Sequence, residues 1–173
     1  MDDPRVPRHG QDTLPGPSRL LIAGLLTGVV DGLFATVQNL LSGSTPARLW
    51  QNVAFTVLGP ASFEGGARTA LIGLLLHFGV AFGWSTVFFL LVRQSARLRQ
   101  VLAKPSGIIK VAAVYGPFIW LVMSLAVIPL LVQRPPNITG RWWVQLIGHF
   151  PFVGLPIVAS IAWPLLRRRP AAA

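Results

Sequence analysis

Residues 20–41, LLIAGLLTGVVDGLFATVQNLL, decide the fold of this chain. They hold one acidic residue, Asp31, and no Lys or Arg. A run of this length crosses about 30 Å of hydrocarbon as an α-helix, because each helical residue rises roughly 1.5 Å. Backbone groups find no water partner in that layer, so the run is predicted to be a membrane-spanning helix.

Three more apolar runs follow the first, and a Pro- and Gly-rich segment precedes it. The runs span residues 67–92, 108–132 and 143–166. We therefore predict an all-α fold, an integral membrane four-helix bundle that forms one domain over residues 19–169. Residues 1–18 cannot bury enough apolar surface to order themselves, so a disordered tail is predicted there.

The composition agrees with a surface that faces lipid. Hydrophobic residues make up 53% of the 173 residues and charged residues 12%, about half the share in an average soluble domain. The absence of cysteine excludes disulfides, thiolate zinc sites and iron–sulfur clusters. The net charge of +10 comes from basic residues that lie between the apolar runs rather than in one patch. This pattern favours loops at an anionic membrane surface over nucleic acid binding.

Lys and Arg are distributed unevenly between the two sides of the predicted bundle. Four spans bring three basic segments to one side, and these hold Arg5, Arg8, Arg19, Arg93, Arg97, Arg99, Lys104, Lys110, Arg167, Arg168 and Arg169. The other side holds Arg48, Arg68, Arg134 and Arg141. Short cytoplasmic loops carry the excess of basic residues. We therefore predict that the N-terminal tail and the C-terminus both lie on the cytoplasmic side of a plasma membrane.

The connection between the first two spans is predicted to be helical as well. Thr45 followed by Pro46 is typical of a helix N-cap with proline at the first helical position. Apolar residues then recur on one helical face: Leu49, Trp50, Val53, Ala54, Val57 and Leu58. Gln51 lies off that face. We predict a short external amphipathic helix over residues 46–58 that lies at the membrane interface between helices 1 and 2.

Small residues recur every four positions in the first two spans. The first span carries Gly24, Gly28 and Gly32, and the second carries Gly79 and Gly83. Such stripes let helices approach closely, either within the bundle or between copies of the chain. The lipid bilayer is the predicted partner of the chain. A second copy of the chain, forming a homo-oligomer, and another membrane protein are further possible partners between which the sequence does not decide. Prolines inside the last two spans predict kinks.

Three ionisable side chains lie at similar depth inside the predicted spans. Asp31, His77 and His149 lie roughly 15, 15 and 9 Å below the outer ends of their helices, at 1.5 Å per residue. A carboxylate in hydrocarbon costs at least about 2.5 kcal/mol unless it has a partner. We therefore predict an intramembrane polar cluster of Asp31, His77 and His149.

Three hypotheses follow for this cluster. It is a structural device that joins helices, a transport or proton-relay site, or a bis-histidine haem b site with His77 and His149 as ligands. No cofactor is predicted outside the haem hypothesis, and no metal site is predicted. Paired carboxylates, nucleophile motifs, phosphate loops and HExxH are all missing from the sequence, which predicts no catalytic residue and favours a protein that is not an enzyme.

Three stretches carry a resemblance to known proteins: residues 74–84 (LLLHFGVAFGW), 115–123 (YGPFIWLVM) and 148–156 (GHFPFVGLP). They resemble a group of uncharacterised bacterial inner-membrane proteins and, more distantly, YagU-like proteins, which have four spans and a histidine in the second and the last. The resemblance implies a bacterial inner membrane and four helices, and it carries no activity. Small multidrug transporters share the four helices and an acidic residue in the first, but they lack the tail, the interfacial helix and the strong charge bias.

The sequence therefore favours a non-enzymatic inner-membrane protein that acts structurally or as a subunit of a membrane assembly. A small proton-coupled transporter and a haem b electron-transfer protein are the alternatives.

Overall fold

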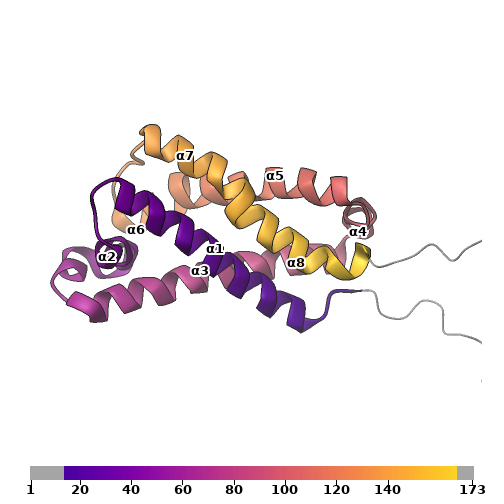
Figure 1. Ribbon diagram of the computed structural model, residues 1–173, viewed down its shortest axis with the longest axis horizontal. Helices are drawn as coiled ribbons and strands as arrows, with labels where there is room; N and C mark the ends of the chain where they lie inside the picture. Colours follow the sequence, from indigo (N-terminus) through magenta and orange to yellow (C-terminus); the bar gives the residue numbers. More distant parts are fainter. Residues whose placement is uncertain (1–13, 167–173) are drawn as a thin grey trace, which may run out of the picture.

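The described part of the chain consists of helices and the loops that join them. The computed structural model describes residues 14–166, and four helical segments within them are long and apolar enough to cross a membrane (Figure 1). These segments are Pro17–Leu41 (α1), Gly66–Gln94 (α3), Pro105–Val132 and Gly140–Leu166. The predicted all-α membrane bundle is thereby confirmed. Each segment begins up to three residues before its predicted start.

The third and fourth segments are each built from three pieces. The third consists of α5 (Pro105–Val122), η2 (Met123–Val127) and α6 (Ile128–Val132). The fourth consists of α7 (Gly140–His149), η3 (Phe150–Gly154) and α8 (Leu155–Leu166). Both η2 and η3 are π-helical. Two short helices, α2 (Pro46–Leu58) and α4 (Ala96–Leu102), connect the spans.

Proline sets the start of three helices. Pro17, Pro46 and Pro105 stand in the first turns of α1, α2 and α5, where a missing backbone N–H costs nothing. As a result α1 includes the last two residues of the predicted tail, Pro17 and Ser18. The predicted disorder of residues 1–13 and the predicted end of the domain at residues 167–169 lie outside the described residues.

The spans are ordered α3, α1, α8 and α5 around the bundle. α1 packs against both α3 and α8, and α5 packs against η3 and α8. α3 and α5 meet mainly through side chains: the Tyr115 hydroxyl donates to the Trp84 carbonyl at 2.7 Å, and the Tyr115 ring centroid lies 4.8 Å from that of Phe88. Both ends of the described chain lie at the end of the bundle that carries α4, here called the α4 end, and α2 lies at the opposite, α2 end (Figure 1).

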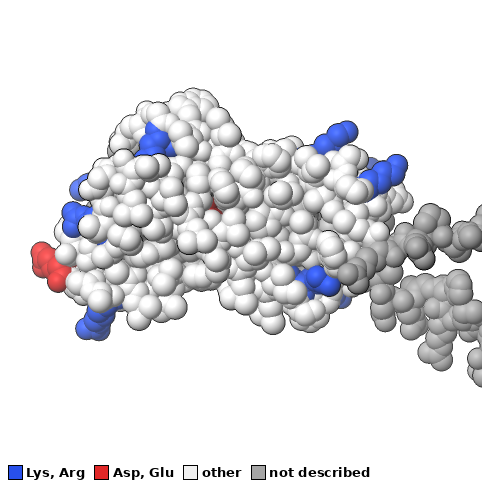
Figure 2. Space-filling model, in the orientation of Figure 1, with Lys and Arg blue, Asp and Glu red and all other residues white. Residues whose placement is uncertain are grey.

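The middle of the molecule presents an apolar surface. Figure 2 shows Lys and Arg gathered at the two ends, with an almost uncharged band between them. Large apolar side chains stand out from this band, including Leu33 at 62% and Val114 at 71% exposure. Exposed apolar surface on this scale is what a lipid-facing bundle presents.

The two glycine stripes lie in different surroundings. A Cβ at Gly24 would overlap the ring of Phe82, and one at Gly28 would overlap the ring of Phe78. These glycines thus let α3 lie close against α1. A Cβ at Gly79 or Gly83 would meet no atom of the described chain within 4 Å. The second stripe faces outward, away from the bundle.

α2 lies across the α2 end rather than along the spans (Figure 1). It has the predicted bounds, and the Thr45 side chain accepts a hydrogen bond from the Arg48 backbone N–H at 3.2 Å, as expected of an N-cap. Its Trp50 carbonyl packs where a Cβ at Gly73 would stand, so α2 sits directly on α3. Gln51 was predicted to lie off the packed face, yet it is buried because its amide donates to the Gly66 carbonyl at 3.2 Å.

The π-helical segments stand next to prolines. η2 ends two residues before Pro129, and η3 contains Pro151 and ends two residues before Pro156. A proline removes a backbone donor and clashes with the carbonyl four residues earlier, and a π-turn is one way to accommodate this. The indole nitrogen of Trp142 in α7 donates to the Ser124 hydroxyl in η2 at 3.1 Å, which links the two irregular spans.

Candidate functional site

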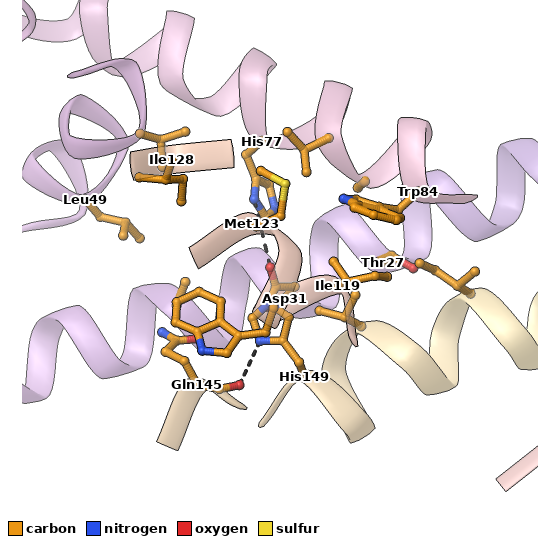
Figure 3. A pocket seen from close by; sticks show the side chains of 17 residues that line it. Thr27, Asp31, Leu49, His77, Trp84, Ile119, Met123, Ile128, Gln145 and His149 are labelled. Atoms are coloured by element: carbon orange, nitrogen blue, oxygen red, sulfur yellow. Dashed lines mark hydrogen bonds and ion pairs between the residues drawn. The ribbon is translucent and has the colours of Figure 1, made fainter. Parts of the chain in front are cut away.

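A cavity lies inside the bundle between all four spans and α2. Its volume is about 260 Å³, and most of its wall is apolar. The polar side chains in the wall are Thr27, Asp31, His77, Gln145 and His149 (Figure 3). The predicted polar cluster thus lines a cavity, which the sequence did not reveal.

Asp31 and His77 form the central pair of this wall. His77 Nδ1 lies 4.0 Å from Asp31 Oδ2, and the side chains are 14% and 18% exposed respectively. His77 Nε2 lies 2.9 Å from the carbonyl oxygen of Gly28. A carbonyl only accepts, so Nε2 carries a hydrogen and donates it. In a neutral ring Nδ1 then has a lone pair that faces the carboxylate.

The Asp31–His77 pair places an acidic and a basic side chain next to each other. At 4.0 Å the two groups are at ion-pair distance, which is longer than a direct hydrogen bond. Both groups belong to the cavity wall, so the pair can present charge to whatever enters the cavity.

His149 enters the same wall from the end of α7. Its Nδ1 lies 2.7 Å from the Gln145 carbonyl oxygen, to which it donates, and its ring lies 4.8 Å from that of Trp120. Asp31 is near enough to act electrostatically on both His149 and His77, and Figure 3 shows its carboxylate among the two rings. The structure therefore brings together all three residues that the depth argument selected.

Two other polar groups in the wall have no hydrogen-bond partner within residues 14–166. They are the Thr27 hydroxyl and the Trp120 indole nitrogen, and both are buried. Sequence reasoning missed both. Thr27 precedes Asp31 by four positions and so shares its helical face, a spacing that could have identified it. Nothing in the sequence marks Trp120, because its distance from the cluster depends on how α5 packs against α7.

The residues as arranged do not fit a bis-histidine haem site. His77 Nε2 donates to the Gly28 carbonyl, and Nδ1 faces the Asp31 carboxylate rather than the space between the two histidines, so His77 as placed does not present a nitrogen to iron. A haem ligand of this kind needs an uncommitted imidazole nitrogen. No group of three His, Asp or Glu side chains within residues 14–166 is placed to hold a metal ion.

Comparison with known proteins gives no relative for this chain. No family model matches it, and neither a curated protein nor a solved structure is significantly similar to it. What the site does must therefore be argued from its own geometry. That geometry offers a carboxylate–histidine pair, a second histidine, two polar groups without a hydrogen bond in the described part of the chain, and apolar walls, with two π-helical segments beside them.

Proposed function

We propose that this chain is a small proton-coupled transporter of the bacterial inner membrane, not an enzyme, which binds a small solute in the cavity between its spans. The observation that carries the proposal is the Asp31–His77 pair in the cavity wall. Ionisable side chains inside a bundle are costly and typically belong to substrate or proton pathways. Membrane orientation follows from the basic residues, with the α4 end in the cytosol.

The state of the polar groups favours transport over a purely structural role. A polar cluster that serves packing has its hydrogen bonds satisfied, because a half-satisfied network is less stable than an apolar core. Here the Thr27 hydroxyl and the Trp120 indole nitrogen belong to residues that line the cavity, and neither has a hydrogen bond in the described part of the chain. Such groups are suited to a ligand that supplies the missing donor or acceptor.

The wall chemistry suits a small organic cation. Asp31 is the one carboxylate among the residues that line the cavity, and Trp84 and Trp120 present aromatic surface to the same space. A carboxylate and indole rings together attract a positive charge in an apolar setting. The volume of about 260 Å³ admits a molecule with a single ring, since an apolar cavity of roughly 150 Å³ holds benzene.

Coupling follows from competition for one carboxylate. When the cation enters, the proton shared by Asp31 and His77 leaves, and the Asp31 carboxylate then faces the cation. When the cation departs, the pair takes a proton back. The cavity therefore never holds an unpaired carboxylate. The π-helical segments η2 and η3 contribute Met123 and Val153 to the wall, and irregular turns of this kind recur at functional sites.

Uptake into proteoliposomes tests this proposal. The full-length chain is reconstituted, an outward proton gradient is imposed, and entry of radiolabelled benzyltrimethylammonium is measured. We expect gradient-dependent uptake that Asp31→Asn abolishes. Glu64→Gln removes the exposed carboxylate of the α2 end and should leave uptake unchanged. The proposal would be overturned by any of three results. These are uptake that does not depend on the proton gradient, no uptake by the parent chain, or uptake that is retained in Asp31→Asn.

A further inference from the structure

Two hollows on the outside of the bundle meet at one residue, Lys110. One has a volume of about 500 Å³, lies between α4 and the start of α5, and is lined by basic and polar side chains. The other has a volume of about 510 Å³, lies between α3 and α5, and is almost wholly apolar. Lys110 belongs to both linings. We propose that together they bind one anionic phospholipid, with its phosphate in the basic hollow and an acyl chain in the apolar groove.

The basic hollow holds charges that no described residue neutralises. Arg97, Lys104 and Lys110 line it and are exposed, and their side chains make no hydrogen bond or ion pair within residues 14–166. Like charges held in one hollow repel, and a bound anion removes that cost. The Ser106 side chain adds a hydroxyl donor to the same lining.

Two neighbouring arginines differ from the three cations of the hollow. Arg99 donates to the carbonyls of Val92 and Arg93 at 2.9 and 2.8 Å, and thereby closes the end of α3. Arg93 in turn reaches the Pro15 carbonyl at 3.4 Å. These two cations are engaged in holding the fold. The three in the hollow are not, which leaves them available to a ligand.

The hollow is also rigidly built. The Val101 carbonyl at the end of α4 packs where a Cβ at Gly107 would stand, so α4 lies directly on α5. Leu102 beneath it is fully buried. Backbone contact and a buried anchor thus fix the position of α4 relative to the start of α5, the two segments that carry the cationic side chains.

The apolar groove leads from the charged end into the lipid-facing band. Lys110, Val114 and Phe118 follow each other at four-residue spacing, so they share one face of α5 over about 12 Å. Phe88 and Tyr115 pack ring to ring at the bottom, and Leu91 forms the opposite rim from α3. α3 and α5 meet mainly through side chains, and the groove lies between these two helices.

The combination selects a phospholipid rather than a free anion. Inorganic phosphate would use the basic hollow and leave the groove without a role. A zwitterionic lipid would fill the groove but bring its own positive charge next to the three cations of the hollow. An anionic lipid with an acyl chain matches both parts, and basic pockets beside spanning helices are suited to such headgroups. This inference does not depend on the transport proposal.

Native mass spectrometry of the full-length protein tests the site. The protein in detergent is mixed with equal amounts of phosphatidylglycerol and phosphatidylcholine, and the ratio of bound lipids is measured. We expect preference for phosphatidylglycerol, reduced about five-fold in Lys110→Gln and in Lys104→Gln, since each charge near a membrane surface contributes on that scale. Arg68→Gln, at the α2 end, is the matched control and should keep the parent ratio.

A groove variant separates lipid from free phosphate. Val114→Trp fills the apolar part and leaves the cations in place, so it should reduce bound phosphatidylglycerol, and inorganic phosphate should not displace the lipid from the parent chain. Equal retention of the two lipids, an Arg68→Gln effect as large as that of Lys110→Gln, or displacement by phosphate alone would each overturn the proposal. Lys104 is exposed, so Lys104→Gln keeps the test available if Lys110→Gln does not fold.

Discussion

The two halves of the bundle are built differently. Toward the α4 end the fully buried side chains are apolar and large, such as Phe88, Leu102 and Ile161. Toward the α2 end many buried side chains are polar, such as Asn39, Gln51 and His149, and the cavity and both π-helical segments lie there. The α4 half thus has the packing of a stable core. The α2 half is less densely packed and contains polar groups and a cavity, as functional regions commonly do.

Matched isoleucine truncations measure this difference most directly. Ile161 is fully buried in the apolar cluster, whereas Ile128 lines the cavity. We expect Ile161→Ala to lower the free energy of unfolding by about 2–5 kcal/mol, because it leaves a void in dense packing. Ile128→Ala only enlarges existing space, so it should cost under about 1 kcal/mol. Thermal unfolding in detergent checks both. Equal losses would mean that the halves do not differ in packing.

A glycine pair gives the next largest contrast. In Gly28→Val the new side chain meets the Phe78 ring and disturbs the carbonyl that accepts from His77, so a loss of about 1–3 kcal/mol is expected. Gly79→Val points into open space and should leave thermal stability in dilute detergent unchanged. Analytical ultracentrifugation of the same variants tests self-association. If Gly79→Val shifts a dimer to monomer, the outward stripe joins two copies of the chain.

Removal of one hydroxyl from the α4 half should have a smaller effect. Tyr115 donates to the Trp84 carbonyl, and this bond is one of the direct links between α3 and α5. Tyr115→Phe keeps the ring contacts and loses the hydrogen bond, which is expected to cost about 1 kcal/mol. Thermal unfolding measures it. An unchanged midpoint would show that the ring contacts of Tyr115 with Phe88 and Trp84 are sufficient to hold α3 and α5 together.

The sequence predicted the spans well because the membrane imposes one requirement on them. About twenty apolar residues with internal hydrogen bonding are needed, and four such runs can be read directly. The meeting of Asp31, His77 and His149 could also be foreseen, because helix rise alone gives their depth. The depth of a residue along its helix does not say how that helix is rotated about its own axis. For this reason the sequence did not predict the cavity or the unsatisfied polar groups of Thr27 and Trp120.

Helix rotation is hard to read in a membrane because both faces of a span are apolar. In water the polar face of a helix identifies the exposed side, but lipid and protein core offer similar surroundings. Gly28 and Gly79 therefore have the same sequence signature, although one contacts Phe78 and the other faces outward. The burial of Gln51 was not predicted for a related reason. Its partner, the Gly66 carbonyl, lies at the start of α3, and the spacing of residues along α2 carries no information about α3.

The smallest effect on stability is expected at the centre of the α2 half. Asp31→Asn keeps the shape of the side chain and removes the charge that is costly in the bundle. If the pair served stability, this change would lower the unfolding midpoint. If it serves proton exchange, the midpoint should stay the same or rise, because functional groups are commonly held at the expense of stability. His77→Ala is a poor substitute, since it also removes the bond to Gly28. A clear drop in the thermal midpoint of Asp31→Asn, with uptake retained, would assign the cluster to packing and remove the main contrast between the two halves.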